Sequence, residues 1–189
     1  MNTILSLFPD SQPCYEKRIK DKPTNHEVCL AIPKGKKYFG WFTYYLNNPI
    51  FFLVDINKKN IYYKYTSFNP ILCNTVIYGT QFYYKSNETF CIEDVLLFQS
   101  KQVHFFSYKK KIDLIHFIFR NVHRHQIEKI CLMFGYPVYS TSIDELYNNS
   151  KIPYTVYCYQ YRELNKLSPY LNYFIDKKNQ ANNILSFVQ

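Results

Sequence analysis

Long apolar runs are missing from this sequence of 189 residues. No stretch approaches the roughly 18 consecutive apolar residues of a membrane-spanning helix. The opening MNTILSLFPDSQ also lacks the basic start and long apolar core of a secretory signal. We therefore expect an intracellular protein of the cytoplasm or nucleus, or of a virion or viral factory if the source is a virus, with no membrane partner. An apolar fraction of 47% excludes wholesale disorder and fits one domain with a complete core.

Paired metal-binding or disulfide motifs are missing too. The six cysteines include no CxxC pair, and none has a histidine at zinc-finger spacing. Most stand among apolar or aromatic neighbours, as in NPILCNTVIY and TVYCYQY, which indicates buried and reduced thiols. The GK of PKGKK lacks the glycine spacing and the following Ser/Thr of a phosphate-binding P-loop. We expect no structural metal and no cofactor.

Positive charge is what the sequence has in excess. The formal net charge is +9, and a basic surface favours anionic partners, of which nucleic acid is the commonest. The chain also holds 20 Tyr and 16 Phe. Because Tyr, Phe, Ile, Lys and Asn have A/T-rich codons, a genome of low G+C content is an alternative explanation for both features. Function therefore has to be argued from where these residues stand.

The chain divides into a polar N-terminal arm, one domain and a polar tail. Residues 1–27 hold three prolines and the charged run EKRIKDK, which is typical of an arm or linker. The domain spans residues 28–176, and the tail spans 177–189. Apolar runs separated by turn signals predict six strands joined as hairpins in the first half of the domain. These runs are EVCLAI, YFGWFTYYL, PIFFLVDI, IYYKYT, TVIYGTQFYY and ETFCIEDVLLF.

The apolar period becomes helical after the sixth strand. Residues 109–134 carry apolar side chains at helical spacing and Gly135 follows them, so we expect one or two helices that cover the sheet. A short helix should begin near Ser142, where Ser and Thr precede acidic residues at capping distance. IPYTVYCYQYRE predicts another strand, and LSPYLNYFI predicts a final strand or short helix. The fold class is therefore α+β with antiparallel sheets.

The segment AIPKGKKYFGWF, together with the order of the strands, resembles the nucleotidyltransferase core shared by mRNA capping guanylyltransferases and nucleic-acid ligases. It also resembles the non-catalytic cap-binding domain of the snurportin type. The resemblance covers roughly Val28 to Phe174 and implies this core without an OB domain. Gly35 matches the glycine of the first motif and Lys37 replaces its arginine, but Ile32 stands where the enzymes carry the nucleophilic lysine. An isobutyl side chain cannot attack an α-phosphate.

Two further segments carry the resemblance. Where the enzymes have Asp-Gly-Glu, this chain has Tyr78-Gly79-Thr80, and Thr80 and Gln81 can form hydrogen bonds but cannot replace a metal-binding carboxylate. FCIEDVLLF resembles the family's aromatic-x-Ile-x-Asp-Ile-Leu strand, with Asp94 on the matching Asp. Phe98 falls where the snurportin type carries a base-stacking Trp. Phe98 is therefore a stacking candidate, and the alternative is a core residue, because an alternating strand buries one face.

The enzymes' catalytic elements are missing together. IPYTVYCYQYRE lacks the glutamate of the fourth motif, and LSPYLNYF lacks the Lys-x-Lys that holds the α-phosphate in the enzymes. Since the nucleophile and the metal carboxylates are absent as well, the resemblance implies a pseudoenzyme with no catalytic residues. We predict a module that binds the 5′ end or cap of RNA, or a guanine nucleotide, within a polymerase or RNA-processing complex.

The candidate ligand-binding residues combine cations for phosphates with aromatic and polar groups for a base. They are Lys34, Gly35, Lys36, Lys37, Tyr78, Thr80, Gln81, Phe98, Arg120 and Arg124. Solvated surface is the alternative for the lysine turn and for the arginines. Two other functions stay open. One is a scaffold in which Tyr78 and Phe98 fill the former cleft, and the other is an active ligase or guanylyltransferase in which Lys34 or Lys36 replaces the missing lysine.

Overall fold

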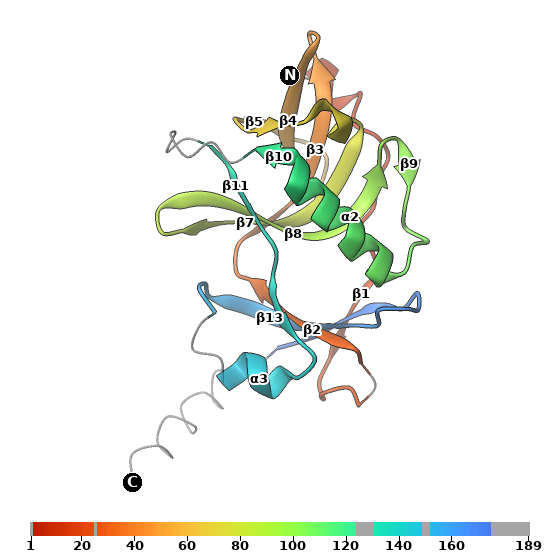
Figure 1. Cartoon of the computed structure of the whole chain (residues 1–189), viewed down its shortest axis with the longest axis vertical. Coiled ribbons are helices and arrows are strands. Elements are labelled where there is room, and N and C mark those ends of the chain that lie inside the picture. The colour runs from red at the N-terminus through yellow and green to blue at the C-terminus, as the bar shows by residue number, and fades with distance from the viewer. Residues whose placement is uncertain (1, 25, 124–130, 149–151, 175–189) are drawn as a thin grey trace.

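The computed structural model describes residues 2–24, 26–123, 131–148 and 152–174, and its strands form two main sheets with few helices, an α+β arrangement (Figure 1). The large sheet consists, in spatial order, of β11 (Met133–Gly135), β8 (Asn87–Phe98), β7 (Thr75–Tyr84), β3 (Lys36–Tyr45), β4 (Asn48–Asp55) and β5 (Ile61–Lys64), with β9 (Lys101–Gln102) paired to β8. The small sheet consists of β1 (Glu16–Ile19), β14 (Tyr170–Tyr173), β13 (Val156–Arg162), β2 (Val28–Pro33) and β12 (Val138–Ser140).

The remaining described elements are short, apart from one helix. They are α1 (Asn2–Leu5), β6 (Ser67–Phe68), the 3-10 helix η1 (Pro70–Leu72), α2 (Tyr108–Asn121), β10 (Val122–His123) and α3 (Ile143–Asn148). β10 pairs with β6, and the pairings within the sheets are antiparallel except for β1 with β14 and β11 with β8. No helix in the described part of the chain is long and apolar enough to cross a membrane.

The predicted strands between residues 28 and 98 are present, but they do not form one set of hairpins. β2 pairs with β12 and β13 of the small sheet, whereas β3 begins the large sheet. The chain changes sheets at Lys34 and Gly35. Gly35 is required there because a Cβ atom would collide with the backbone carbonyl oxygen of Gln81. The all-hairpin prediction was therefore wrong for the first strand, since turn signals do not reveal which sheet a strand joins.

The predicted helical segment is also shorter than its apolar period. α2 ends at Asn121, and Val122 has extended dihedral angles. Residues 124–130 lie outside the described residues, and β11 then forms a strand that pairs in parallel with Thr89–Cys91. Phe134 packs edge-on against Phe51, with ring centroids 5.1 Å apart. This long-range contact outweighs the helical spacing, so the extension of the helix to residue 134 was wrong. α3 and β14 occupy the positions predicted for a short helix and for a final element.

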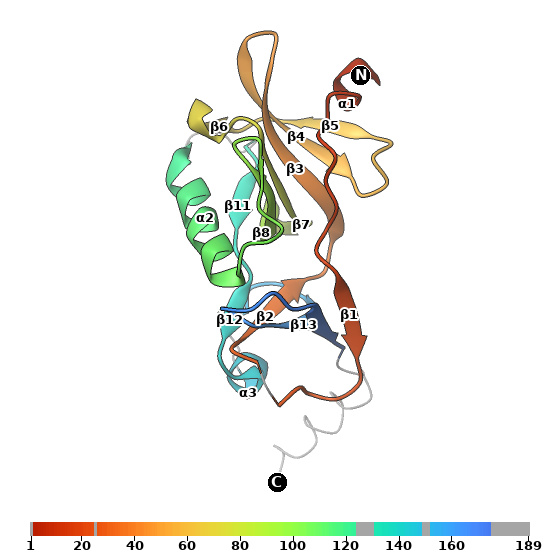
Figure 2. The ribbon, with the colours of Figure 1, turned by 90° about the vertical axis from the view of Figure 1, so that its right-hand side faces the viewer.

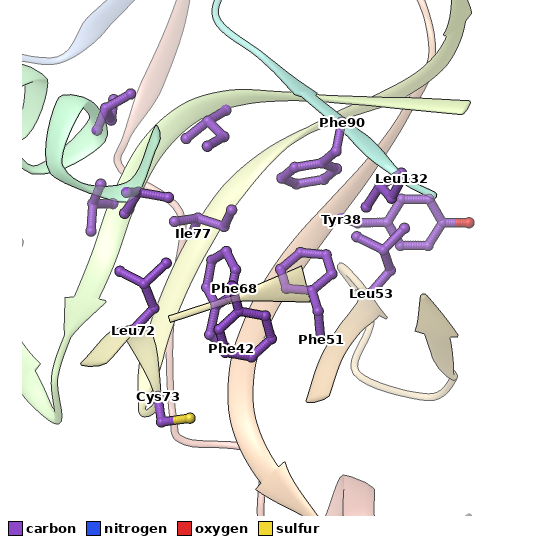
Figure 3. Packing of buried hydrophobic residues seen from close by; sticks show 14 of the residues in the cluster. Tyr38, Phe42, Phe51, Leu53, Phe68, Leu72, Cys73, Ile77, Phe90 and Leu132 are labelled. Carbon is purple, nitrogen blue, oxygen red and sulfur yellow. The ribbon is translucent and has the colours of Figure 1, made fainter. Parts of the chain in front are cut away.

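The main core lies between the large sheet and α2 (Figure 3). Phe42 and Phe51 have ring centroids 4.6 Å apart, and Phe90 lies on the neighbouring part of the same face. Ile115 and Ile118 close this core from the helix and are fully buried. Each such side chain stabilises the fold by roughly 1.5–3 kcal/mol. The helix therefore covers the sheet through its apolar stripe, and Lys109, Lys110 and Arg120 are exposed on its other side.

The N-terminal arm covers the opposite face of the large sheet (Figure 2). Phe8 packs against Phe39 and Trp41, with ring centroids 5.6 and 5.5 Å apart. The chain then descends to β1, which pairs with β14 at the edge of the small sheet. Residues 1–27, expected to be a polar arm outside the domain, thus contribute a helix and a strand that connect the two sheets. The predicted tail, 177–189, lies outside the described residues.

Candidate functional site

The predicted lysine turn does not gather its cations at one point. Lys34 and Lys36 are exposed, and the Nζ atom of Lys36 lies 5.0 Å from the ring centroid of Tyr38 and 5.8 Å from that of Tyr62. Lys37 extends from the other face of β3, because successive strand residues alternate. Its ammonium group forms an ion pair with the buried carboxylate of Glu93. Lys37 is therefore already paired with a carboxylate, and Lys36 lies on the opposite face of β3 from it.

The carboxylate of Glu93 contacts two of the predicted ligand-binding residues, Lys37 and Thr80. It accepts a hydrogen bond from the Thr80 hydroxyl and pairs with Lys37, whose Nζ atom also lies 5.5 Å from the Tyr78 ring. Gly79 allows this arrangement, since a Cβ atom there would collide with the carbonyl oxygen of Cys91 on β8. Lys37, Tyr78 and Thr80 thus lie close together. They form a closed polar cluster around a glutamate that the sequence analysis passed over.

The two aromatic residues proposed to hold a base lie in different apolar clusters. Tyr78 is 8% exposed and packs against Phe39, and burial raises the pKa of its hydroxyl. Phe98 is half-buried on the other face, edge-on to Phe117 of α2 at a centroid distance of 5.6 Å. Phe98 therefore packs against the core, which was the alternative interpretation of this residue. Both side chains are packed inside the fold, which is the arrangement that the scaffold alternative expected.

The other predicted residues are scattered. The side-chain amide of Gln81 donates a hydrogen bond to Glu88, which also pairs with Lys64. Arg120 is exposed near the end of α2, and its Nε atom donates to the carbonyl oxygen of His116 in the same helix. Arg124 lies outside the described residues. These residues therefore do not extend the Glu93 cluster.

A buried charged junction joins the two sheets. Arg162 is 2% exposed and its guanidinium group donates to the backbone carbonyl oxygen of Glu93 at 2.7 Å and, through Nε, to Gln160 at 2.8 Å. The same group lies 4.3 and 3.8 Å from the ring centroids of Tyr108 and Tyr170. Arginine suits this position because its planar guanidinium can donate several hydrogen bonds and stack on aromatic faces at once.

A second ion pair lies beside this junction. Lys111 of α2 places its Nζ atom 2.9 Å from one carboxylate oxygen of Asp94, and both side chains are at most 2% exposed. The Tyr170 hydroxyl donates to the other oxygen at 3.2 Å, and Cys14 of the N-terminal arm lies 3.1 Å from Lys111 Nζ. Burial, and then the nearby Asp94 charge, raise the pKa of the Cys14 thiol. The arm, α2 and the small sheet therefore meet at one polar centre.

A hollow of about 410 Å³ opens directly beside this centre, and we call it the arm hollow. Its walls come from the N-terminal arm, from the loop before α2 and from the loop before β14. They are formed by Cys14, Tyr15, His104, Phe105, Phe106, Tyr108, Lys111, Lys166, Leu167, Ser168, Pro169 and Tyr170. Tyr15 and Phe105 are 71% and 57% exposed. The volume lies within the range of small-ligand sites, and exposed rings at its rim could stack on a planar group.

The rim of the arm hollow is basic. Lys166 lines it, and Lys110 places its Nζ atom 5.6 Å from the ring centroid of Phe106, another lining residue. Both lysines are exposed, and Lys166 Nζ lies 3.6 Å from the carboxylate of Glu163 in a surface ion pair. α2 begins at the same place and has no acidic residue in its first turn. The positive end of the helix dipole therefore adds to the two ammonium groups, and the combination favours an anion at the rim.

No local sequence pattern predicts the arm hollow, because its walls lie far apart in the chain. Tyr15 stands in the segment expected to be an arm, and Phe105 stands in the run HFF between the last predicted strand and KKK. Adjacent aromatic residues followed by lysines, in a segment without strand alternation, were the available signal. Within the described residues, no group of three or more His, Cys, Asp or Glu side chains is arranged to hold a metal ion.

Comparisons with known proteins give no functional assignment for the site. Neither a family model nor a curated protein sequence matches the chain.

Proposed function

We propose that this chain is a non-catalytic, nucleotidyltransferase-like module that binds the 5′ end of RNA, a cap or a guanine nucleotide, and that it does so in the arm hollow. The observation that carries this proposal is the combination of exposed Tyr15 and Phe105 with Lys166 in one hollow of about 410 Å³. Aromatic rings hold a base and ammonium groups hold phosphates, so the hollow has both chemistries that a nucleotide requires. The original candidates at Tyr78 and Phe98 are replaced by residues accessible to a ligand.

The expected energetics favour a terminal nucleotide over internal RNA. Stacking on an aromatic side chain contributes roughly 1–3 kcal/mol per base, and a methylated, cationic guanine adds a cation–π interaction. A 5′-terminal nucleotide carries more phosphate charge near one base than an internal nucleotide does. Lys166 lines the hollow and Lys110 lies over the ring of Phe106, another lining residue, so both lysines support a place for this charge at the rim. Binding should therefore weaken with salt but retain a salt-insensitive part from stacking.

The nucleotidyltransferase relationship is part of the same proposal. It is supported by the strand motifs. Ile32, which stands where the enzymes have their nucleophile, is buried in β2, which supports the absence of catalysis. The displaced-lysine alternative needs Lys34 or Lys36 to attack a phosphate. Lys36 instead lies over two tyrosine rings, and Lys34 is exposed outside the arm hollow. We expect no covalent adduct when the protein is incubated with radiolabelled GTP or ATP and a divalent cation.

A calorimetric titration tests the proposal. A methylated cap analogue, its unmethylated counterpart and GTP are titrated at two salt concentrations into wild type and into Tyr15→Ala and Phe105→Ala. Each substitution should weaken binding by about tenfold or more. Tyr83→Ala is the matched control, since Tyr83 is 73% exposed on β7 and is absent from the hollow. Equal effects of all three substitutions, or no binding by wild type, would overturn the proposal.

A docking role is the second candidate, and the edge strand β5 favours it. Tyr62 and Tyr63 are 40% and 54% exposed on this strand, which is paired with β4 on only one side among the described strands. Exposed aromatic residues on a free sheet edge are typical of strand-addition interfaces. A polymerase or RNA-processing partner would bind there. Silent titrations, together with loss of a defined protein partner in Tyr62→Ser/Tyr63→Ser, would favour docking over nucleotide binding.

A further inference from the structure

The strand β1 continues directly from the wall of the arm hollow. Tyr15 lines the hollow, and Glu16 is the first residue of β1. Likewise, Pro169 lines the hollow, and the partner strand β14 begins at Tyr170. The two strands are parallel, with Glu16 opposite Tyr170, and β1 lies at the edge of the small sheet (Figure 2). At about 3.3 Å for each residue, the four residues of β1 extend about 13 Å away from the hollow.

The outer edge of β1 is free and basic. Among the described strands, β1 pairs only with β14, so no strand covers its other side. The exposed cations of β1 and the residue after it are Lys17, Arg18 and Lys20. None of these three forms an ion pair with a carboxylate in the described part of the chain. Of the two acidic residues in the same segment, Glu16 accepts a hydrogen bond from Asn172 and Asp21 is exposed. The edge therefore carries a net positive charge that is open to a ligand.

Aromatic rings adjoin these cations. The Cζ atom of Arg18 lies 4.7 Å from the ring centroid of Phe174. Phe174 in turn packs edge-on against Tyr157, with centroids 5.3 Å apart, and Tyr157 is 52% exposed. We call Arg18, Phe174 and Tyr157 the β1 platform. Aromatic faces next to cations are typical of surfaces that bind single-stranded nucleic acid, because bases stack on the rings while the cations attract phosphates.

The partner that fits this edge is an extended polyanion. Successive residues of a strand point to opposite faces, so Lys17 and Arg18 flank the outer edge from its two sides. A phosphate backbone along the edge could contact both cations and the unpaired backbone N–H groups between them. A peptide strand fits less well, because charged residues on an edge strand oppose pairing with another strand. Single-stranded RNA also has bases for the β1 platform, which a peptide lacks.

We propose that single-stranded RNA continues from the arm hollow along β1, with its phosphates at Lys17, Arg18 and Lys20 and one base on the β1 platform. This inference rests on the proposed function and defines its ligand more closely, as a 5′-terminal RNA segment of a few nucleotides rather than a free cap or mononucleotide. The arm hollow holds the first nucleotide, and β1 holds those that follow. Binding of RNA should therefore depend on salt more steeply than binding of a mononucleotide, because each additional phosphate contact releases counterions.

Titrations of GTP and of the 5′-triphosphorylated RNA pppGAAAA over a series of salt concentrations test the charged edge. We expect the RNA to bind about tenfold more tightly than GTP at low salt. In Lys17→Gln/Arg18→Gln, the slope of log K against log salt for the RNA should become shallower by about 1.4, at roughly 0.7 for each phosphate contact. The GTP affinity should not change, since neither residue lines the arm hollow. Lys59→Gln/Lys85→Gln is the control, because both lysines are exposed in turns of the large sheet.

Tyr157→Ala tests the β1 platform separately from the charges. Loss of stacking should weaken binding of pppGAAAA about fivefold or more at every salt concentration, and the slope should stay as in wild type. Tyr139→Ala is the matched control, since Tyr139 is 61% exposed on β12 at the opposite edge of the small sheet.

The outcomes distinguish this inference from the proposed function. If GTP binds but pppGAAAA binds no more tightly, RNA does not follow β1 and only this inference fails. The same holds if the salt slope changes equally in Lys17→Gln/Arg18→Gln and in its control, or if Tyr157→Ala weakens RNA binding no more than Tyr139→Ala does. If GTP itself does not bind, or if Tyr15→Ala leaves its affinity unchanged, the proposed function fails and this inference fails with it.

Discussion

The guanidinium group of Arg162 donates a 2.7 Å hydrogen bond to the backbone carbonyl oxygen of Glu93. This contact connects β13 of the small sheet to β8 of the large sheet across 69 residues of sequence. Glu93 occupies an irregular point in the strand pairing, between Tyr78↔Asp94 and Gly79↔Ile92. The irregularity turns its carbonyl oxygen away from the regular ladder and toward the other sheet. The junction of the two sheets is therefore polar and specific, and it supports the floor of the arm hollow through Tyr108 and Tyr170.

Loss of Arg162 should strongly destabilise the fold. In Arg162→Ala, Gln160 and the Glu93 carbonyl oxygen lose their donor, and a void opens between two tyrosine rings. We expect the free energy of unfolding to fall by about 3–5 kcal/mol, measured by urea denaturation. Arg120→Ala is the control, since Arg120 is exposed and bonds only within its own helix. A loss below about 1 kcal/mol would show that the junction does not hold the sheets together.

The Asp94–Lys111 ion pair should show strong coupling in a double-mutant cycle. Asp94→Asn and Lys111→Met each leave a buried charge without its partner, and each should cost about 3–5 kcal/mol. The double variant removes both charges, so its loss should be clearly smaller than the sum of the single losses. The free energies are measured by urea denaturation of all four proteins. Additive losses would mean that the two groups act independently.

Stability should decline at alkaline pH because of two buried thiols. Burial raises the pKa of Cys29 and of Cys158 from an ordinary 9.0 to about 12. Since these pKa values are higher in the folded state, the unfolded chain releases the protons first as pH rises. The stabilising contribution is therefore complete below pH 9 and is lost between pH 9 and about 12. The urea midpoint of Cys29→Ala/Cys158→Ala should fall less steeply over that interval than the wild-type midpoint. Parallel slopes would contradict this assignment.

The hairpin between β3 and β4 offers a stabilising substitution. Leu46 and Asn47 have positive φ angles of 49° and 62°, and the Leu46 side chain is 77% exposed. A positive φ is unfavourable for leucine but is tolerated by asparagine, and two such residues fit a type I′ turn. Leu46→Asn should therefore raise the free energy of unfolding by about 0.5–1 kcal/mol. The same substitution at exposed Leu167 is a control for the loss of surface leucine. An unchanged or lower thermal midpoint for Leu46→Asn would contradict the strain argument.

Sequence patterns predicted local structure better than the junction between the sheets. β7 and β8 were predictable because runs rich in aromatic and β-branched residues lie between turn signals. The assignment of β2 to the other sheet was not, since pairing depends on partners more than 100 residues away. Residues 133–135 continue the helical spacing of apolar residues but form the strand β11, because Phe134 packs into the aromatic core.

In the candidate site, too, the kinds of residue were predictable but their long-range arrangement was not. The sequence indicated a basic and aromatic surface but placed the ligand on Tyr78 and Phe98, which the structure packs into apolar clusters. Glu93 was not predicted, because the neighbouring Asp94 is the residue that matches the motif of the nucleotidyltransferases that the sequence resembles. Tyr15 and Phe105 line the same hollow only after the N-terminal arm has crossed the large sheet. No local pattern encodes that crossing.

Photo-crosslinking of a short RNA with a photoreactive nucleotide at its 5′ end tests the central claim most directly. The crosslinked peptides are identified by mass spectrometry, and an RNA with the same nucleotide at an internal position is the control. We predict that the 5′-terminal nucleotide crosslinks to the residues around Tyr15 and Phe105, and that excess cap analogue or GTP prevents this. Crosslinks confined to the Lys34–Lys37 turn, or equal crosslinking of the internal nucleotide, would contradict binding of an RNA 5′ end in the arm hollow.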